Sequence, residues 1–109
     1  MPYEEALAQR VRKALARRKG FVEKKMFGGV GFLLHGNMCC GVWKEFLILR
    51  LGKEAADDAM REPHVLPFDI TGKAMSGWAM VEPDGIIEDK SLKEWIAKAH
   101  KFVSALPKK

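Results

Sequence analysis

The chain has 109 residues, of which 48% are hydrophobic and 30% are charged. This composition is typical of a globular protein and excludes a disordered or collagen-like chain, and the length suits one domain, residues 1–109, with a single core. No stretch is long and apolar enough to span a bilayer, and the N-terminus lacks the features of a signal peptide. The two cysteines, Cys39 and Cys40, are adjacent and suggest no disulfide framework. We therefore expect a cytoplasmic protein that does not bind a membrane.

The net charge of +5 is concentrated near the N-terminus, where residues 10–25 contain eight basic residues and one acidic residue, Glu23. An electrostatic partner is therefore expected to meet this segment. One interpretation is a stripe that follows the phosphates of nucleic acid, made of Arg10, Lys13, Arg17, Lys24 and Lys25. The other is a solvated helix face, which is favoured because no aromatic residues suited to base stacking are interleaved with the stripe.

Residues 4–19 are predicted to form an amphipathic helix, because Leu7, Val11, Ala14 and Leu15 recur at spacings of three and four. Acidic residues in its first turn and basic residues in its last suit the helix dipole. Gly20 is expected to end this helix.

Strands are predicted over residues 23–27, 31–35, 38–43 and 46–51, in an antiparallel meander. Gly36-Asn37 predicts a two-residue type II′ hairpin turn. This register pairs Leu34 with Cys39 and Leu33 with Cys40, so that one face carries Leu33, Cys40 and Val42 and the other carries Phe32, Leu34, Cys39 and Trp43. Both faces are apolar, and each needs a cover, from helices on both sides or from a second copy of the protein.

The second half of the chain is predicted to begin with a short helix over residues 53–61, ended by Pro63. An extended segment at residues 68–70, a turn at residues 71–73 and a strand over residues 75–81 follow. Pro83-Asp84-Gly85 predicts a turn, because proline presets the backbone angle of its first central position.

The last helix has the clearest pattern in the sequence. One apolar face is formed by Leu92, Trp95, Ile96, Ala99, Phe102, Val103 and Leu106. Asp89 or Ser91 is expected to cap its start, and Ser91 with Glu94 matches a capping box; Pro107 is expected to stop it. The predicted fold is α+β: a mainly antiparallel sheet of about five strands, with an N-terminal helix, a short middle helix and a long C-terminal amphipathic helix packed on it.

The run Lys-Met-Phe-Gly-Gly-Val-Gly-Phe at residues 25–32 is similar to the N-terminal domain of the TfoX/Sxy competence regulators. Short matches continue in the same order at Gly36-Asn37-Met38, Leu47-Ile48-Leu49-Arg50, Pro67-Phe68, Gly72-Lys73, Met75, Trp78 and Trp95. The resemblance covers essentially the whole chain. Its most specific part is Met26-Phe27-Gly28-Gly29, directly ahead of a hairpin.

This resemblance implies an α+β domain in proteins connected with positive control of DNA-uptake genes. The full-length regulators carry a second, helical C-terminal domain, and the chain is expected to be a stand-alone N-terminal domain. We therefore expect a non-enzymatic regulatory domain that contacts a protein partner or a second copy of itself. The alternative is a small basic nucleic-acid-binding module that uses the first helix.

The segment Met26, Phe27, Gly28 and Gly29 has two interpretations. Its glycines could leave backbone N–H groups open to a ligand, or they could form a tight bend with Met26 and Phe27 buried. The bend is favoured, because the spacing of a phosphate-binding P-loop is missing.

No pattern in the sequence predicts a catalytic, cofactor or metal site. Neighbouring strand residues point to opposite faces, so Cys39 and Cys40 are not expected to share a metal, and both are predicted to be buried; an enzyme that uses either thiol is a third, disfavoured interpretation. The other candidate groups are predicted to lie apart on the solvated surface: His35, His64, His100, Asp57, Asp58 and Asp84.

Overall fold

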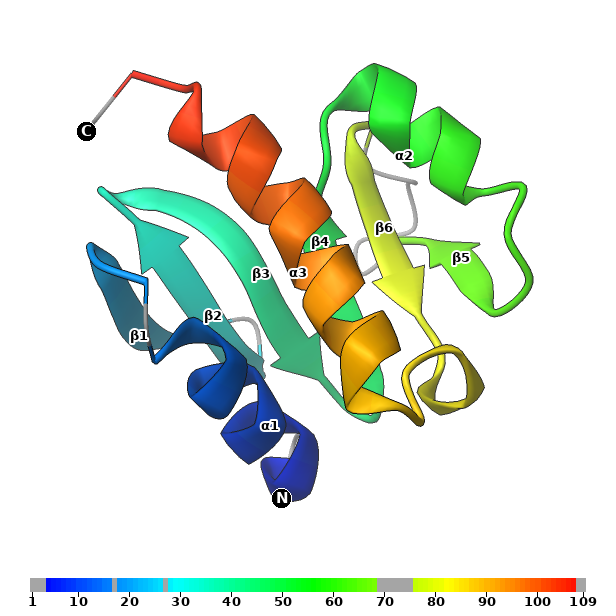
Figure 1. Cartoon of the computed structure of the whole chain (residues 1–109), viewed down its shortest axis with the longest axis horizontal. Helices are drawn as coiled ribbons and strands as arrows, with labels where there is room; N and C mark the ends of the chain where they lie inside the picture. The colour runs from blue at the N-terminus through cyan, green and yellow to red at the C-terminus, as the bar shows by residue number, and fades with distance from the viewer. Residues whose placement is uncertain (1–3, 17, 27, 69–75, 108–109) are drawn as a thin grey trace.

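The computed structural model of the chain describes residues 4–16, 18–26, 28–68 and 76–107. These residues form a six-stranded antiparallel sheet and three α-helices (Figure 1). The strand order is β1-β2-β3-β4-β6-β5. The bounds are α1 Glu5–Leu15, β1 Phe21–Met26, β2 Gly29–Leu34, β3 Asn37–Trp43, β4 Phe46–Arg50, α2 Lys53–Ala59, β5 Val65–Pro67, β6 Trp78–Val81 and α3 Asp89–Ser104.

The predicted α+β class and the order of its elements are confirmed, with six strands where about five were expected. The additional strand is β5, which has only three residues and lies at the sheet edge beside β6. It ends in Pro67, which removes a backbone donor and makes the segment look unlike a strand in the sequence. The predicted extended residues 69 and 70, the turn at 71–73 and the start of the predicted strand at residue 75 lie outside the described residues.

The first helix is shorter than predicted, because α1 ends at Leu15 and not at Lys19. Gly20, the predicted helix stop, directly precedes β1, and its carbonyl accepts a hydrogen bond from the N–H of His35 at 3.2 Å. The helix ends five residues before Gly20 because the chain must connect α1 to the start of β1 at Phe21. Its predicted apolar face is otherwise confirmed, since Leu7, Val11 and Leu15 are buried.

The β2–β3 turn differs from the predicted type II′ turn at Gly36-Asn37. Leu34 pairs with Asn37, so the loop consists of His35 and Gly36. Their φ angles are 50° and 85°, and two positive values in succession are what a type I′ turn requires. Gly36 therefore occupies the second loop position.

The predicted register of this hairpin is also wrong, because the ladder shifts between Phe32 and Leu33. Phe32 pairs with Cys40 and Leu33 with Met38, which leaves Cys39 as the extra residue of a β-bulge. The alternation of side chains is interrupted there. Cys39 and Cys40 consequently both belong to the core beneath the helices, and the prediction that they point to opposite faces fails.

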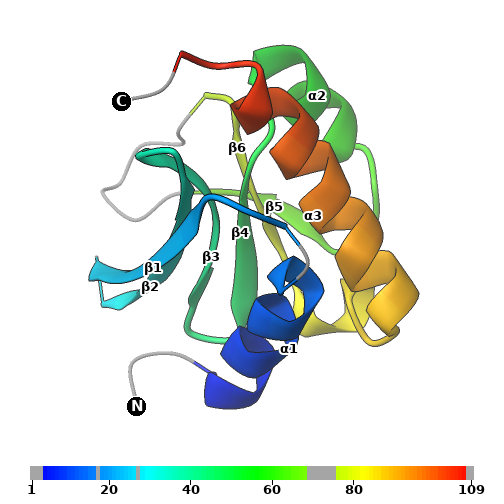
Figure 2. The same ribbon diagram turned by 60° about the vertical axis from the view of Figure 1, so that its left-hand side comes forward.

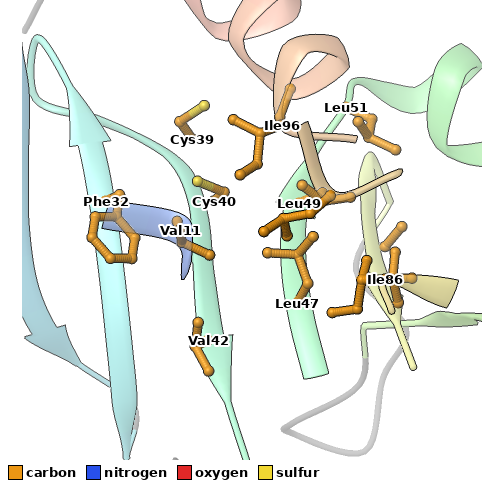
Figure 3. Packing of buried hydrophobic residues seen from close by; sticks show 14 of the residues in the cluster. Val11, Phe32, Cys39, Cys40, Val42, Leu47, Leu49, Leu51, Ile86 and Ile96 are labelled. Atoms are coloured by element: carbon orange, nitrogen blue, oxygen red, sulfur yellow. The ribbon is translucent and has the colours of Figure 1, made fainter. Parts of the chain in front are cut away.

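The main core lies between the helices and one face of the sheet, which we call the inner face. Figure 3 shows Val11 of α1, Cys40 of β3, Leu49 of β4 and Ile96 of α3 pointing into the same interior. Each of these four side chains is at most 1% exposed. The small middle helix α2 joins this core through Ala56 and Ala59, so all three described helices cover the inner face (Figure 2).

The C-terminal helix confirms its predicted apolar face, with Leu92, Ile96, Ala99 and Val103 buried. Its predicted caps are wrong: α3 begins at Asp89, Glu88 is the N-cap residue, and no side chain caps the helix start. Tertiary contacts hold the start of α3 instead: Arg10 of α1 donates hydrogen bonds to Asp89 and to the carbonyl oxygen of Ile86.

Candidate functional site

The face of the sheet opposite the helices, which we call the outer face, carries its own apolar cluster. The cluster is formed by Trp43, Phe46, Ile48, Leu66, Phe68, Trp78 and Met80. Three members, Ile48, Phe68 and Met80, are buried, and the others are half-buried. None of the described helices lies over this cluster (Figure 2). The prediction of two apolar sheet faces is therefore confirmed, whereas helices cover only one of them in the described part of the chain.

The outer face continues across the other half of the sheet, toward edge strand β1. Val22 pairs with Leu33, and both face outward because their neighbours Phe21, Phe32 and Leu34 belong to the main core. Val22 is 64% exposed, which is unusual for a large apolar side chain in a strand. The outer face thus carries apolar side chains on both halves of the sheet, with Val22 and Leu33 on β1 and β2 and the cluster on the other strands.

Positive charge accompanies this apolar surface. The Nζ atom of Lys44 lies 4.6 Å from the ring centroid of Trp43, and the guanidinium carbon of Arg50 lies 5.6 Å from the ring centroid of Trp78. Lys24 is exposed on the same face of β1. Among the described strand residues that face outward, none is acidic. A partner with apolar residues and an acidic rim would complement such a surface.

The family motif at residues 26–29 forms the end of the β1–β2 hairpin. Met26 pairs with Gly29, and Gly28 between them has a φ of 75°, which glycine adopts readily. This pairing and backbone angle are those that a tight bend requires. Phe27 and the side chain of Met26 lie outside the described residues, so the predicted burial of these two side chains stays a prediction.

Of the predicted basic stripe, the structure brings only Arg10 and Lys13 together among the described residues, at one recess between α1 and α3. Arg10 is used inside the fold: its Nη2 atom donates to the carbonyl oxygens of Ile86 and Ile87 at 2.6 and 3.3 Å, and its Nε atom donates to Asp89 at 3.2 Å. These bonds fasten α1 to the start of α3. Their partners lie 76 to 79 residues away in sequence, and no local pattern could reveal them.

The remaining members of the stripe are separated. Lys24 and Lys25 lie on opposite faces of β1, Lys13 is exposed on α1, and Arg17 lies outside the described residues. The neighbouring Arg12 is neutralised by two carboxylates. It donates to Glu23 at 2.6 and 2.8 Å and to Glu5 at 2.9 Å. Its hydrogen bond holds the pKa of Glu23 below the usual value.

The three histidines lie apart, as predicted. His35 is in the β2–β3 turn, His64 lies 3.5 Å from Glu82 before β5, and His100 is on α3. The predicted surface acids Asp57, Asp58 and Asp84 are exposed. No group of three or more described His, Cys, Asp or Glu residues is arranged to hold a metal ion.

His100 is partly buried beside two residues of the α1–β1 connection and β1. Its Nδ1 atom lies 3.2 Å from Arg18 Nη1, and its ring centroid lies 5.9 Å from that of Phe21. Because a guanidinium only donates, the neutral ring must accept at Nδ1. Burial lowers the pKa of His100, and the charge of Arg18 lowers it further.

We expect His100 to titrate below pH 6.5 in the folded protein, as measured by NMR of its ring nitrogens. Its contribution to stability is fully present above the unfolded pKa and is lost as the pH falls through the folded pKa. Arg18→Gln should raise the pKa of His100 only partway, because burial is the larger cause. A return to the unfolded value in that variant would contradict this order of causes.

The two cysteines are completely buried in the main core, as predicted. A hydrogen bond with Cys39 and burial both raise the pKa of Cys40. We therefore expect neither thiol to react with a thiol reagent at pH 8 in the native protein, and two thiols per chain to react in guanidinium. Rapid labelling of either thiol before unfolding would show that the core opens at β3.

Within the described residues, no helix is long and apolar enough to cross a membrane. The fold is that of an α+β domain in which an antiparallel sheet is covered by helices on one face and displays apolar surface on the other. The chain belongs to the TfoX N-terminal domain family, whose model matches residues 13–103. This is a family of regulatory domains, and the resemblance at residues 25–32 is thereby confirmed. No curated protein matches the sequence.

Proposed function

We propose that the protein is a regulatory domain that acts by binding a protein partner through the outer face of its sheet. The observation that carries this proposal is the exposed Val22 on the same face of the sheet as the half-buried aromatic residues of the outer-face cluster. Exposed and half-buried apolar side chains on an uncovered sheet face mark sites of protein–protein contact. Membership of the TfoX N-terminal domain family supports a competence-regulator-like role, in control of DNA-uptake genes in the cytoplasm.

The charges on the outer face favour a different protein over a second copy of this chain. In a symmetric dimer through this face, both surfaces would carry Lys24, Lys44 and Arg50, with no acidic side chain among the described outward strand residues to pair with them, and like charges oppose such contact. A partner with an apolar centre and an acidic rim avoids this repulsion. Self-association is the alternative way to cover the same surface.

The test is affinity capture of the tagged chain from its native cell, with and without nuclease, alongside light scattering of the purified protein. We expect a captured protein that survives nuclease and is lost with Val22→Lys. Ile87→Lys is the matched control, because Ile87 is also highly exposed, at 72%, but lies outside the sheet. A dimer that Val22→Lys dissociates would identify the occupant of the outer face as a second copy.

Two results would contradict the proposal. One is a strict monomer that captures no protein. The other is capture that disappears with nuclease and is unaffected by Val22→Lys, which would favour the nucleic-acid-binding alternative.

A further inference from the structure

A basic cleft lies between α1 and α3, on the helix-covered side of the sheet. Its volume is about 690 Å³, within the range of small-molecule sites, roughly 300–1,000 Å³. Among the described residues, its charged lining consists of four cations and one acid: Arg10, Lys13, Arg18, Lys93 and Asp89. The cleft therefore concentrates positive charge in a concave surface, which the outer-face proposal does not use.

One pair of these charges is already satisfied. Arg10 Nη2 lies 3.1 Å from the carboxylate of Asp89, and the same nitrogen donates to the carbonyl oxygen of Ile86. Asp89 therefore compensates Arg10 and leaves the other cations of the cleft unopposed. The net charge available to a ligand comes from Lys13, Arg18 and Lys93.

Arg18 is positioned by a neighbour that carries no compensating charge. Its Nη1 atom donates to Nδ1 of His100 at 3.2 Å, which uses one of its five N–H donors. Within the described part of the chain, the side-chain ammonium groups of Lys13 and Lys93 make neither a hydrogen bond nor an ion pair. Ala14 and Leu92 supply apolar lining between these cations. The cleft thus combines an oriented guanidinium, two free ammonium groups and a small apolar surface.

We propose that this cleft binds the phosphate group of a small molecule. A phosphate offers three acceptor oxygens and up to two negative charges, which suit one guanidinium and two ammonium groups better than a single carboxylate does. The apolar lining from Ala14 and Leu92 would contact the body of the ligand. The site lies on the opposite side of the sheet from the outer face, so that a ligand and a protein partner can be bound together.

The geometry favours a small ligand over a nucleic-acid backbone. A backbone needs a row of cations along an extended groove. Outside the cleft, Arg12 is neutralised by Glu5 and Glu23, and Lys24 lies on the outer face. None of the aromatic residues that the structure describes lines the cleft. Lys13, Arg18 and Lys93 therefore meet in one recess and do not form an extended row.

The test is an NMR titration of the full chain with inorganic phosphate, pyrophosphate and AMP, at an ionic strength held constant with chloride. We expect saturable shifts of backbone amides around Lys13, Arg18 and Lys93. Tighter binding of AMP than of inorganic phosphate would identify a nucleotide as the source of the phosphate, and equal binding would identify the phosphate group itself; both support the site.

Two double variants with the same change in net charge separate the cleft from general electrostatics. Lys13→Gln with Lys93→Gln should weaken pyrophosphate binding about tenfold or more, because each removes a charge-assisted hydrogen bond. Lys24→Gln with Lys53→Gln should change it less than about twofold, since neither residue lines the cleft. All four lysines are exposed, so both proteins should fold.

Three results would overturn the proposal: no saturable shift with any of the three probes, equal weakening in both double variants, or shifts of the cleft amides by a DNA duplex at lower concentration than by every small probe. The last result would assign these cations to nucleic acid. Failure to capture a protein partner through Val22 would contradict the proposed function but would not contradict phosphate binding in the cleft.

Discussion

Gly29→Ala should lower the free energy of unfolding by about 3 kcal/mol or more, a large share of the roughly 5–15 kcal/mol that stabilises a native domain. A Cβ atom at Gly29 would overlap the carbonyl oxygen of Val42 on β3, and it would also lie 3.3 Å from the Cα atom of Trp43. These neighbours are backbone atoms of a central strand. They cannot move aside without disrupting the β2–β3 ladder, so the overlap cannot be relieved by a change of rotamer.

The adjacent Gly28 provides the matched control. A Cβ atom there would meet nothing within 4 Å, so only the left-handed backbone conformation, φ 75°, is unfavourable for alanine. Gly28→Ala should therefore lower the free energy of unfolding by about 1–2 kcal/mol. Gly28→Asn should cost less, because asparagine tolerates this conformation. Urea denaturation of the three variants measures the difference. Equal losses at Gly28 and Gly29 would contradict the close approach of β2 and β3.

Ile86→Ala should lower the free energy of unfolding by about 2–5 kcal/mol, because it leaves a cavity in the main core. Ile86 is 1% exposed and lies in the cluster with residues of α1 and α3. The backbone carbonyl that accepts the hydrogen bond from Arg10 remains in the variant. The loss therefore reports side-chain packing alone.

Ile87→Ala is the control for this change, because Ile87 is the next residue in the sequence and the variant removes the same side-chain atoms. Ile87 is 72% exposed, and its truncation should change stability by no more than about 0.5 kcal/mol. Both free energies can be measured by urea denaturation, with the slope m checked for equality. Equal effects at the two positions would contradict the placement of Ile86 in the core.

The helices and strands of this fold could be predicted wherever apolar residues recur at the spacing of a helix or a strand. Leu92, Ile96, Ala99 and Val103 recur at helical spacing and are the buried face of α3. The same reasoning identified the apolar face of α1 and the run of neighbouring antiparallel strands. Such patterns arise because each element must present one side to the core. Apolar residues therefore recur every three or four positions in a helix and every two positions in a strand.

The hairpin register could not be predicted in this way, because it depends on a bulge. One extra residue, Cys39, interrupts the alternation of β3 and places both thiols in the same core. Cys39 and Cys40 are the same residue type, so the sequence does not show which of them is the extra residue of the bulge. A bulge is set by how two strands fit each other and the helices above them, which is a property of the assembled sheet.

The sequence alone established the family, the α+β class, the apolar faces of the long helices and the apolar character of both faces of the sheet. The assembled fold decided which face the helices cover, which of Ile86 and Ile87 is buried, and which basic residues are free to bind. Arg10 is tied to residues near Asp89, whereas Lys13 and Lys93 face a shared cleft. The physical reason is that these contacts join residues about 80 positions apart, and a local pattern carries no information about them.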